Sequence, residues 1–328
     1  MLKAKHLKEL LYTACKPIST KLLLQLSRQN LAIPFYHAVS DNELKHIKHL
    51  YRVPTTKKFI KDLDFLLKYF TPIHLNELSN FLQRKRALSK PALLLTFDDG
   101  LREFHDIVAP ILLQKGIAAT CFLNSSFIDN KDLFYRFKAS LLIEESNKSP
   151  EIASIIKTKV QHLSDCDPKK ILLSINYHNK HILDEIADAI NYDFDFYLQN
   201  TKPFMTSSQI ESLIKKGFTF GSHGIDHPKY KEIPLSTQIN QTNESTRYIC
   251  NKFLLDYKVF AFPFNAEGVE PLFFEKINDI PFSFGTDGFG ESKFKNHIHF
   301  NRISLERNNY SAKGILNTVL LRTLLQPR

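Results

Sequence analysis

The stretch PALLLTFDDG, residues 91–100, decides the fold class, because an almost unbroken apolar run ends in two adjacent carboxylates and a glycine. Parallel strands that are covered on both faces have such continuous apolar runs. Neighbouring anions repel each other and each is costly to desolvate, so Asp98 and Asp99 indicate that a cation or a reacting proton offsets them. The stretch therefore predicts a buried parallel strand with reactive groups at its end.

The segments around this stretch complete a βαβ unit. Residues 102–116 have a helical pattern that ends at Gly116, and IAATCFL, residues 117–123, is a second buried strand. Before the unit, residues 31–40 are predicted to form a strand that enters a loop, and the apolar spacing over 55–70 predicts a helix. The first third of the chain therefore alternates strands with helices.

The same alternation returns in the second half of the chain. The run MTSSQIESLIKKGFTFGSH, residues 205–223, predicts a helix with a capping box at Thr206 and Gln209, an end at Gly217 and a short strand after it. Further strands are predicted at 258–264, 282–286 and 299–305, and helices at 236–253 and 271–277. Strands that alternate with helices, without a repeat in the sequence, predict an α/β protein with a parallel sheet, open or closed into a barrel.

The pattern changes between Asn130 and Thr201, where strand signals vanish and helical runs such as ILDEIADAI, residues 182–190, replace them. We interpret residues 130–201 as a helical insertion into one domain that spans residues 31–328. The segment before it, residues 1–30, is basic and amphipathic, and lysines and a proline interrupt its apolar stretches. It predicts a separate N-terminal helical segment that lies on the protein or near a membrane surface.

Composition limits the class of protein and its partners. Of the 328 residues, 43% are hydrophobic and 24% are charged, which suffices for a large core, and no run approaches the about 20 apolar residues of a membrane-spanning helix. The net charge of +10 permits peripheral contact with anionic membranes. Because the basic residues form no compact stripe, we expect no nucleic-acid partner.

Cysteine usage and the N-terminal segment predict the compartment. Cys15, Cys121, Cys166 and Cys250 follow no CxxC or other regular spacing, which is typical of free thiols in a reducing environment. The N-terminal segment shows no secretory h-region. We therefore expect a cytoplasmic protein, with membrane contact at the inner face.

A histidine pair could bind a metal ion beside the two carboxylates. The loop GSHGIDHP, residues 221–228, contains His223 and His227, and its glycines and proline exclude the helical HExxH zinc motif. A loop can still bring two imidazoles to one ion, and a carboxylate from a neighbouring strand completes a site with two histidines and one carboxylate. Successive strand residues point to opposite sides, so one of Asp98 and Asp99 can bind the ion while the other accepts a proton.

Three motifs together resemble one enzyme family. TFDDG, the histidine pair after KKGFTFGSH, and the run FAFPFN resemble the polysaccharide deacetylases with a NodB homology domain, carbohydrate esterase family 4. The likeness covers residues 31–130 and 203–305. It implies a distorted (β/α) barrel and hydrolysis of N-acetyl groups on amino sugars of a polysaccharide or a lipid-linked glycan.

The resemblance also implies roles for individual residues. Asp98 matches the general base. The residues that match the ligands of a divalent metal ion, zinc by preference, are Asp99, His223 and His227. The residues that resemble the substrate-binding wall of the family are Phe262, Pro263, Phe264 and Asn265.

Two parts of the family pattern are missing. The wall motif lacks its usual arginine, and Arg302 is the candidate to replace it by pairing with Asp98, with an ordinary ion pair to Glu306 as the alternative. No C-terminal histidine motif supplies the acid that protonates the leaving amine. His37, His297 and His299 remain as candidates for that acid.

Two other interpretations stay open. The adjacent aspartates could serve only as the N-cap of the helix that follows them. A catalytically silent glycan-binding protein with the deacetylase fold is the alternative function, and the missing arginine and the unassigned acid favour it. The complete set of two aspartates and two histidines favours an enzyme, because a binding protein needs no base beside the ion.

Overall fold

A curved sheet of nine strands forms the centre of the computed structural model, which describes residues 11–83, 88–160, 167–307 and 310–325. The strand order is β10-β11-β9-β8-β7-β6-β5-β2-β12, and every neighbouring pair is parallel except the β10–β11 hairpin. The strands are β2 (Pro34–Tyr36), β5 (Thr96–Phe97), β6 (Thr120–Leu123), β7 (Thr219–Ser222), β8 (Val259–Ala261), β9 (Phe282–Phe284), β10 (Glu291–Phe294), β11 (His297–Phe300) and β12 (Ile303–Ser304). The predicted α/β class is confirmed.

A smaller parallel sheet lies at the N-terminal ends of two of these strands, in the order β1-β4-β3. It contains β1 (Leu31–Ala32), β3 (Thr71–Pro72) and β4 (Ala92–Leu93). Because β1 leads into β2 and β4 into β5, each apolar run that predicted one strand is divided between the two sheets. The division shortens the strands but keeps both carboxyl ends at the same edge of the main sheet.

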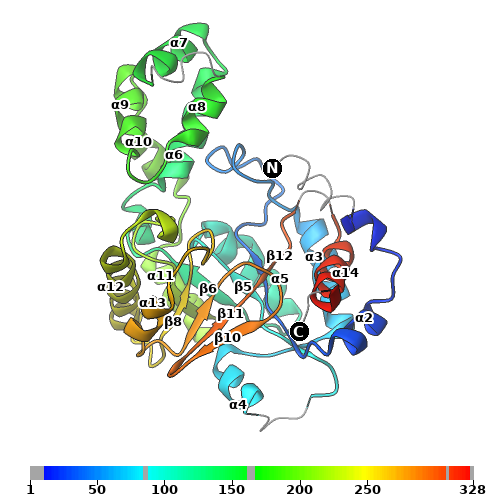
Figure 1. Ribbon diagram of the computed structural model, residues 1–328. Helices are drawn as coiled ribbons and strands as arrows, with labels where there is room; N and C mark the ends of the chain where they lie inside the picture. Colours follow the sequence, from blue (N-terminus) through cyan, green and yellow to red (C-terminus); the bar gives the residue numbers. More distant parts are fainter. Residues whose placement is uncertain (1–10, 84–87, 161–166, 308–309, 326–328) are drawn as a thin grey trace.

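Helices pack along the curved sheet, and in the view of Figure 1 α11, α12 and α13 lie to the left of the strands while α3, α14 and α2 lie to the right. Residues of α3, α11, α12 and α14 contribute to one hydrophobic cluster. The bounds of these and the shorter helices are α2 (Thr20–Ser27), α3 (Thr56–Tyr69), α4 (Leu78–Leu82), α5 (Ala109–Gln114), α11 (Ser207–Lys215), α12 (Leu235–Phe253), α13 (Pro271–Lys276) and α14 (Ala312–Leu325). A π-helical turn at Phe104–Val108 precedes α5, and single 3₁₀ turns lie at Leu75–Glu77, Ile128–Asn130 and Tyr230–Glu232.

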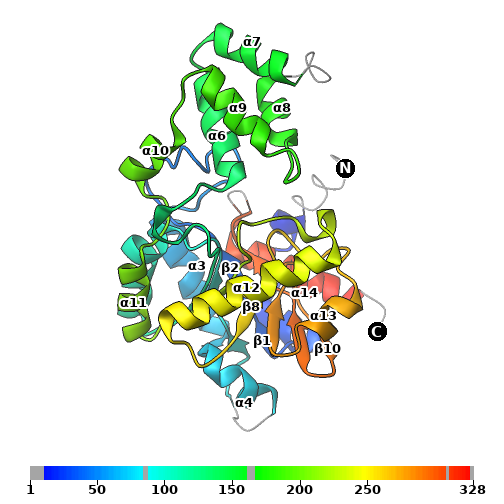
Figure 2. The same ribbon diagram turned by 90° about the vertical axis from the view of Figure 1, so that its left-hand side faces the viewer.

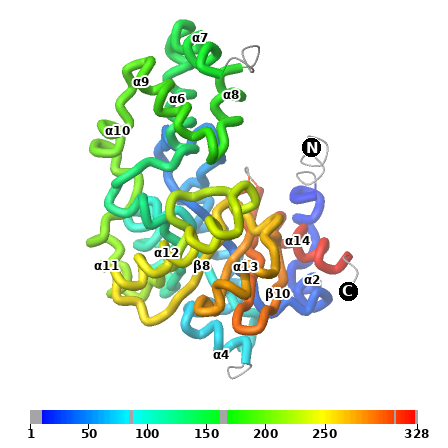
Figure 3. Tube along the Cα trace, turned by 60° about the vertical axis from the view of Figure 1, so that its left-hand side comes forward, coloured from blue at the N-terminus to red at the C-terminus, as the bar shows by residue number. Residues whose placement is uncertain are grey.

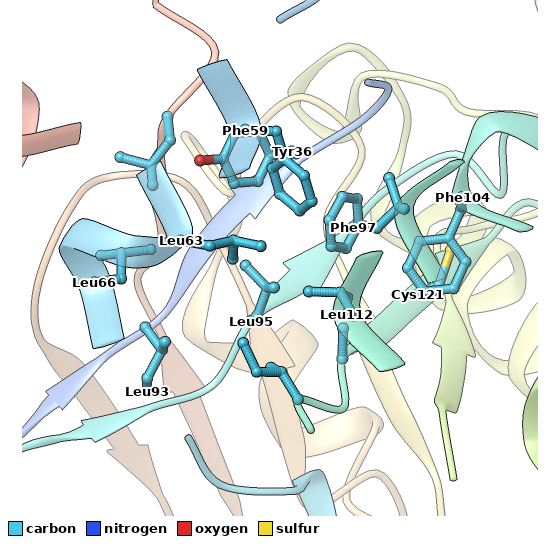
Figure 4. Close-up of a cluster of buried hydrophobic side chains, with 14 of the residues drawn as sticks. Tyr36, Phe59, Leu63, Leu66, Leu93, Leu95, Phe97, Phe104, Leu112 and Cys121 are labelled. Carbon is cyan, nitrogen blue, oxygen red and sulfur yellow. The ribbon is translucent and has the colours of Figure 1, made fainter. Parts of the chain in front are cut away.

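The largest hydrophobic cluster fills the space between α3, α5 and the main sheet (Figure 4). Helix α3 directs Phe59, Leu63 and Leu66 inward, because residues three to four positions apart share one face of a helix. Opposite them, the rings of Tyr36 and Phe97 stack with their centroids 5.7 Å apart. Each of these buried side chains stabilises the fold by about 1.5–3 kcal/mol, so this cluster fixes the strand that ends at Asp98.

The residues of the predicted insertion form a group of helices that stands above the carboxyl ends of the strands (Figures 1 and 2). These helices are α6 (Tyr135–Ser146), α7 (Pro150–Lys159), α8 (Pro168–Ser174), α9 (His181–Ala189) and α10 (Phe194–Thr201). They pack around a hydrophobic cluster of their own. At their base, Asn130 exchanges two side-chain hydrogen bonds with the backbone of Phe204, which holds the two ends of the insertion together.

The N-terminal segment packs against the C-terminal helix, and α2 lies beside α14 (Figure 3). The Asn317 side chain, on α14, donates to the carbonyl oxygens of Cys15 and Ile18, at 3.0 and 2.9 Å. The first ten positions of the predicted segment 1–30 lie outside the described residues. Among the described residues, no helix combines the length and the apolar character needed to cross a membrane.

Candidate active site

A sharp backbone turn after β5 separates the two aspartates. Asp99 and Gly100 both have positive φ angles, of 69° and 65°. The φ angle of Gly100 favours glycine, and a Cβ atom there would lie 2.7 Å from Leu123 Cδ2, so a larger residue would also have to displace that side chain. Asp98 and Asp99 are 2% and 5% exposed, so both carboxylates are buried and need partners.

Arg302 is the partner of Asp98. Its Nη1 and Nη2 atoms each donate to one oxygen of Asp98 at 2.7 Å, which is the two-pronged geometry that guanidinium and carboxylate groups share. Its Nε atom donates to the carbonyl oxygen of Gly285, and its guanidinium lies between the rings of Phe35 and Phe122. Burial acts to raise the pKa of Asp98, but the charge of Arg302 holds that pKa below its usual value. Asp98 is therefore ionised.

Asp99, His223 and His227 converge on one point. Asp99 Oδ1 lies 3.5 Å from His223 Nε2 and 3.2 Å from His227 Nε2, and one ligand atom from each residue lies within 4.8 Å of the others. Asp99 Oδ1 is buried and makes no hydrogen bond. A buried anionic oxygen without a hydrogen bond, next to two imidazole nitrogens, fits a divalent metal ion.

His223 has the tautomer and the charge state of a metal ligand. His223 Nδ1 lies 2.8 Å from the carbonyl oxygen of Ala261, so it carries the proton and leaves the Nε2 lone pair facing Asp99. Burial lowers the pKa of His223 to about 4, so the imidazole is neutral at physiological pH. A neutral imidazole with one nitrogen fixed by a backbone carbonyl is the form in which histidine binds metals.

The loop between the two histidines is tied to the helical insertion. Asp226 accepts hydrogen bonds from Tyr177 at 2.8 Å, from Lys180 at 2.6 Å and, on the barrel side, from Gln241 at 2.8 Å. His227 itself has a φ angle of 62°. The insertion therefore helps to hold a strained ligand loop in place.

His37 and Glu306 form a second, partly buried pair at the site. The His37 side chain lies after β2, with Nδ1 2.5 Å from Glu306 Oε2, and Glu306 Oε1 accepts the backbone N–H groups of His37 and Ala38. Burial acts to lower the pKa of His37, but the Glu306 carboxylate raises it to about 9. His37 is therefore protonated at neutral pH, and since Glu306 holds Nδ1, Nε2–H is the other donor of the ring.

The other candidate acids lie elsewhere. His297 and His299 both approach the Ser283 hydroxyl, at 2.6 and 2.8 Å. Neither histidine lines the cavity that contains Asp98, whereas His37 does.

Glu306 pairs with His37 and not with Arg302, which resolves the alternative that the sequence left open. Because Glu306 follows the end of β12, the strand-end rule that selected Asp98 also applied to it.

One of the four predicted wall residues reaches the cavity. Phe264 lines it, and its ring centroid lies 4.7 Å from that of His227. Phe134 from the insertion also approaches His227, with ring centroids 4.3 Å apart, and the rings of Phe134 and Phe264 lie 6.3 Å from each other. Phe262 is fully buried in an aromatic cluster with Tyr230 and its neighbours, and its side chain does not line the cavity. Pro263 and Asn265 are also outside the lining. Fewer residues of this motif therefore line the cavity than the resemblance implied.

The cavity above these groups has a volume of about 720 Å³. Its floor carries both aspartates, His223 and His227, and its walls come from the loop before α3, from the insertion and from the residues after β12. Individual residues of the insertion and of the loop carried no motif, so the sequence did not identify which of them line the cavity. The floor combines an ionised carboxylate, a ligand set for a cation and a protonated histidine, which are the groups that amide hydrolysis needs.

Comparison with known proteins gives one family. The sequence profile of the family described as polysaccharide deacetylase matches residues 85–271 of this chain. No curated protein sequence matches the chain significantly. The matched range includes both aspartates and both histidines of the cavity floor.

Solved structures with the same fold are distant in sequence. The deacetylase PplD of Streptococcus pyogenes, in complex with acetate, is 14% identical, with a TM-score of 0.57 over 90% of this chain and 98% of its own. IcaB from Ammonifex degensii is 13% identical, with a TM-score of 0.55 over 88% and 97%. A de-N-acetylase from Aggregatibacter actinomycetemcomitans is 13% identical, with a TM-score of 0.56 over 88% and 99%. These likenesses confirm the predicted distorted (β/α) barrel.

Proposed function

Because this chain belongs to the polysaccharide deacetylase family, and is thus a hydrolase of N-acetyl amide bonds that deacetylates glycans, we propose that its catalysis depends on a metal ion held by Asp99, His223 and His227. The substrate in this proposal is an amino sugar of a polysaccharide or of a lipid-linked glycan. The observation that carries the proposal is the convergence of these three ligand atoms beside an ionised, buried Asp98.

Zinc is the ion that fits best. Two imidazole nitrogens and one carboxylate oxygen form the set of three protein ligands found at catalytic zinc sites, which leave a position open for water and substrate. When bound, such an ion stabilises the negative charge that develops on the acetyl carbonyl oxygen. The three predicted ligands would therefore bind the zinc ion and, through it, increase the rate of hydrolysis.

Asp98 supplies the base in this mechanism. It takes a proton from the water that attacks the acetyl carbonyl carbon, and Arg302 keeps the carboxylate ionised and fixes its orientation. The two-pronged pair leaves the carboxylate little freedom to rotate, because both of its oxygens are bonded to Arg302. Arg302 is thus the positioning residue that replaces the arginine missing from the wall motif.

His37 supplies the acid. The departing amine needs a proton when the amide C–N bond breaks, and His37 carries one at neutral pH because of Glu306. Glu306 accepts the His37 backbone N–H group with one oxygen and holds ring atom Nδ1 with the other, which leaves Nε2–H as the donor for the substrate. The two features that favoured a silent binding protein, the missing arginine and the unassigned acid, thus have counterparts in Arg302 and His37.

Acetate release and metal analysis test the proposal together. Purified protein is expected to contain about one zinc ion per chain and to release acetate from N-acetylated glycans or lipid-linked sugars. Chelation should abolish release, and zinc should restore it. Full activity after complete chelation would contradict the metal dependence, whereas metal binding without acetate release from any substrate would favour the glycan-binding alternative.

Peripheral contact with an anionic membrane is a second part of the proposal. The net charge of +10 supports it, as do Leu22 and Leu26 on α2, which are 50% and 53% exposed. Flotation with vesicles that contain anionic lipid tests it, and Leu22→Asp with Leu26→Asp should reduce the bound fraction. Binding that is unchanged by this double substitution, or absent at low salt, would contradict this part.

A further inference from the structure

Three arginines line the outer part of the active-site cavity, and we refer to Arg52, Arg136 and Arg307 as the arginine rim. Each comes from a different part of the chain: the loop before α3, helix α6 of the insertion, and the segment after β12. None belongs to the predicted motifs. The rim shares one continuous cavity with Asp98, Asp99 and the two histidines.

The guanidinium groups of the rim have no carboxylate partner among the residues that the structure describes. Arg136 Nη1 donates to the carbonyl oxygen of Leu173 at 2.6 Å, and Arg307 Nη1 donates to the Tyr12 hydroxyl at 2.9 Å. Arg52 is exposed and has no hydrogen bond within the described part of the chain. Because a guanidinium has five N–H donors, most donors of the rim face the cavity or solvent unused.

The carboxylates of the same cavity do not balance this charge. Asp98 is neutralised by Arg302 and Glu306 by His37, while Asp99 belongs to the metal ligands. Asp287, which is exposed, is the remaining carboxylate of the lining and forms no ion pair among the described residues. Three cations thus face one carboxylate, so the outer cavity is positive and attracts anions.

We propose that the arginine rim binds a phosphate or pyrophosphate group of the substrate, so that the substrate class is a phosphorylated N-acetyl amino sugar. This inference rests on the proposed function, because it places the acetamido group at the metal ligands. Guanidinium groups match phosphate oxygens in two-pronged geometry, and three of them suit a group with more than one negative charge. A neutral glycan has no group to pair with them.

The size of the cavity agrees with this substrate. Its volume of about 720 Å³ lies within the range of about 300–1,000 Å³ that is typical of small-molecule sites, which accommodates one sugar with its phosphate group. The phosphate has two chemical sources: a sugar linked to a polyprenyl lipid and a sugar linked to a nucleotide. Both kinds of substrate present a phosphate group to the rim, and they differ in the polyprenyl or nucleotide portion that is attached to that phosphate.

Acetate release from matched substrates tests the rim. We compare an N-acetylhexosamine 1-phosphate, a nucleotide diphosphate N-acetylhexosamine, a polyprenyl-linked N-acetylhexosamine and a neutral N-acetylated oligosaccharide. kcat/KM is expected to be at least about tenfold higher for the phosphorylated substrates. The lipid arm and the nucleotide arm then identify the source. Equal kcat/KM values for neutral and phosphorylated substrates would overturn the inference.

Substitution of the rim separates charge from geometry. Arg52→Gln, Arg136→Gln and Arg307→Gln should each lower kcat/KM for phosphorylated substrates by about tenfold more than for the neutral one. Arg136→Lys, which keeps the charge but not the planar fork, should fall between wild type and Arg136→Gln. Arg247→Gln is the matched control, because Arg247 pairs with Glu244 on the exposed surface of α12. Losses equal to those of the control would also overturn the inference.

A binding measurement distinguishes this inference from the proposed function. Calorimetric titration of pyrophosphate into chelated protein excludes binding to a metal ion, and the rim variants should weaken that binding while Arg247→Gln should not. If pyrophosphate binds through the rim but no substrate releases acetate, the proposed function fails and the anion site stands. If acetate is released but the rim binds no pyrophosphate, the anion site fails alone.

Discussion

The floor and the rim of the cavity treat charge in opposite ways. On the floor, Asp98 and Arg302 are buried and form a closed pair with each other, and the site is built on strand ends. On the rim, Arg52 and Arg307 are exposed, belong to loops and have no carboxylate partner within the described ranges. Buried charges need fixed partners, whereas exposed charges can bind a ligand. The residues for catalysis and the residues for substrate selection therefore occupy separate parts of this fold.

Substitution of a metal ligand should have the largest effect, and it tests directly whether the floor of the cavity performs the chemistry. His223→Ala removes one of three ligands and should weaken zinc binding by more than about 100-fold, with acetate release falling to the level of the chelated protein. Zinc content by mass spectrometry and acetate release are the measurements. His181→Ala, on the exposed surface of α9, is the matched control. Retention of zinc and turnover in His223→Ala would remove the ligand assignment.

Next in size is the base. Asp98→Asn should keep the metal and lower kcat by about 100- to 10,000-fold, because a general base contributes that much. It also leaves Arg302 buried without an anion, so the melting temperature should fall as well. The control is Asp279→Asn, since Asp279 pairs with Lys258 on the surface. Undiminished turnover with correct metal content would end the assignment.

The pH profile tests the acid. His37 has a raised pKa of about 9, so it is protonated below that value and the rate should fall as pH rises through it. Glu306→Gln removes the charge that raises this pKa, and the alkaline limb of kcat should therefore move to lower pH. The stability that the pair contributes has the same sign: it is complete below the usual pKa of 6.5 and is lost as pH rises through about 9. An unmoved limb would exclude His37 as the acid.

The smallest expected effect is on the scaffold. Thr206 Oγ1 accepts the Gln209 N–H group and Gln209 Oε1 accepts the Thr206 N–H group, which forms the predicted capping box of α11. Thr206→Ala should lower the free energy of unfolding by about 1 kcal/mol and leave kcat/KM within twofold. Denaturant unfolding and acetate release provide the two readings. A large loss of activity at unchanged stability would show that floor and scaffold are not separable.

Much of the fold followed from local patterns in the sequence. The apolar runs that end at Phe97 and Leu123, and the capping box of α11, lie close to the predicted positions. Other elements did not follow from the sequence, and two of them show why. Strand β10 has mostly exposed side chains at the edge of the sheet, so it has no apolar run, and α14 is buried on most sides, so it lacks an amphipathic stripe.

The candidate site divides in the same way. Asp98 is adjacent to Asp99, and His223 lies four positions before His227. These two short spacings allowed the sequence to predict the floor of the site. The partner of Arg302 was undecidable, because Asp98 and Glu306 are both carboxylates and sequence separation does not tell which one lies nearer. The arginine rim had no signal, because insertions and loops are positioned only by the folded barrel.

Arg302 reaches Asp98 across 204 positions of the chain, and this separation has a consequence for the order of folding. During synthesis the strand that carries Asp98 emerges long before its cation does. Until β12 docks beside β2, the carboxylate has no partner at its buried position, and an unpaired buried charge strongly disfavours the closed sheet. The last strand therefore completes the charge balance of the first βαβ unit, so the barrel becomes stable only when its final segment is in place.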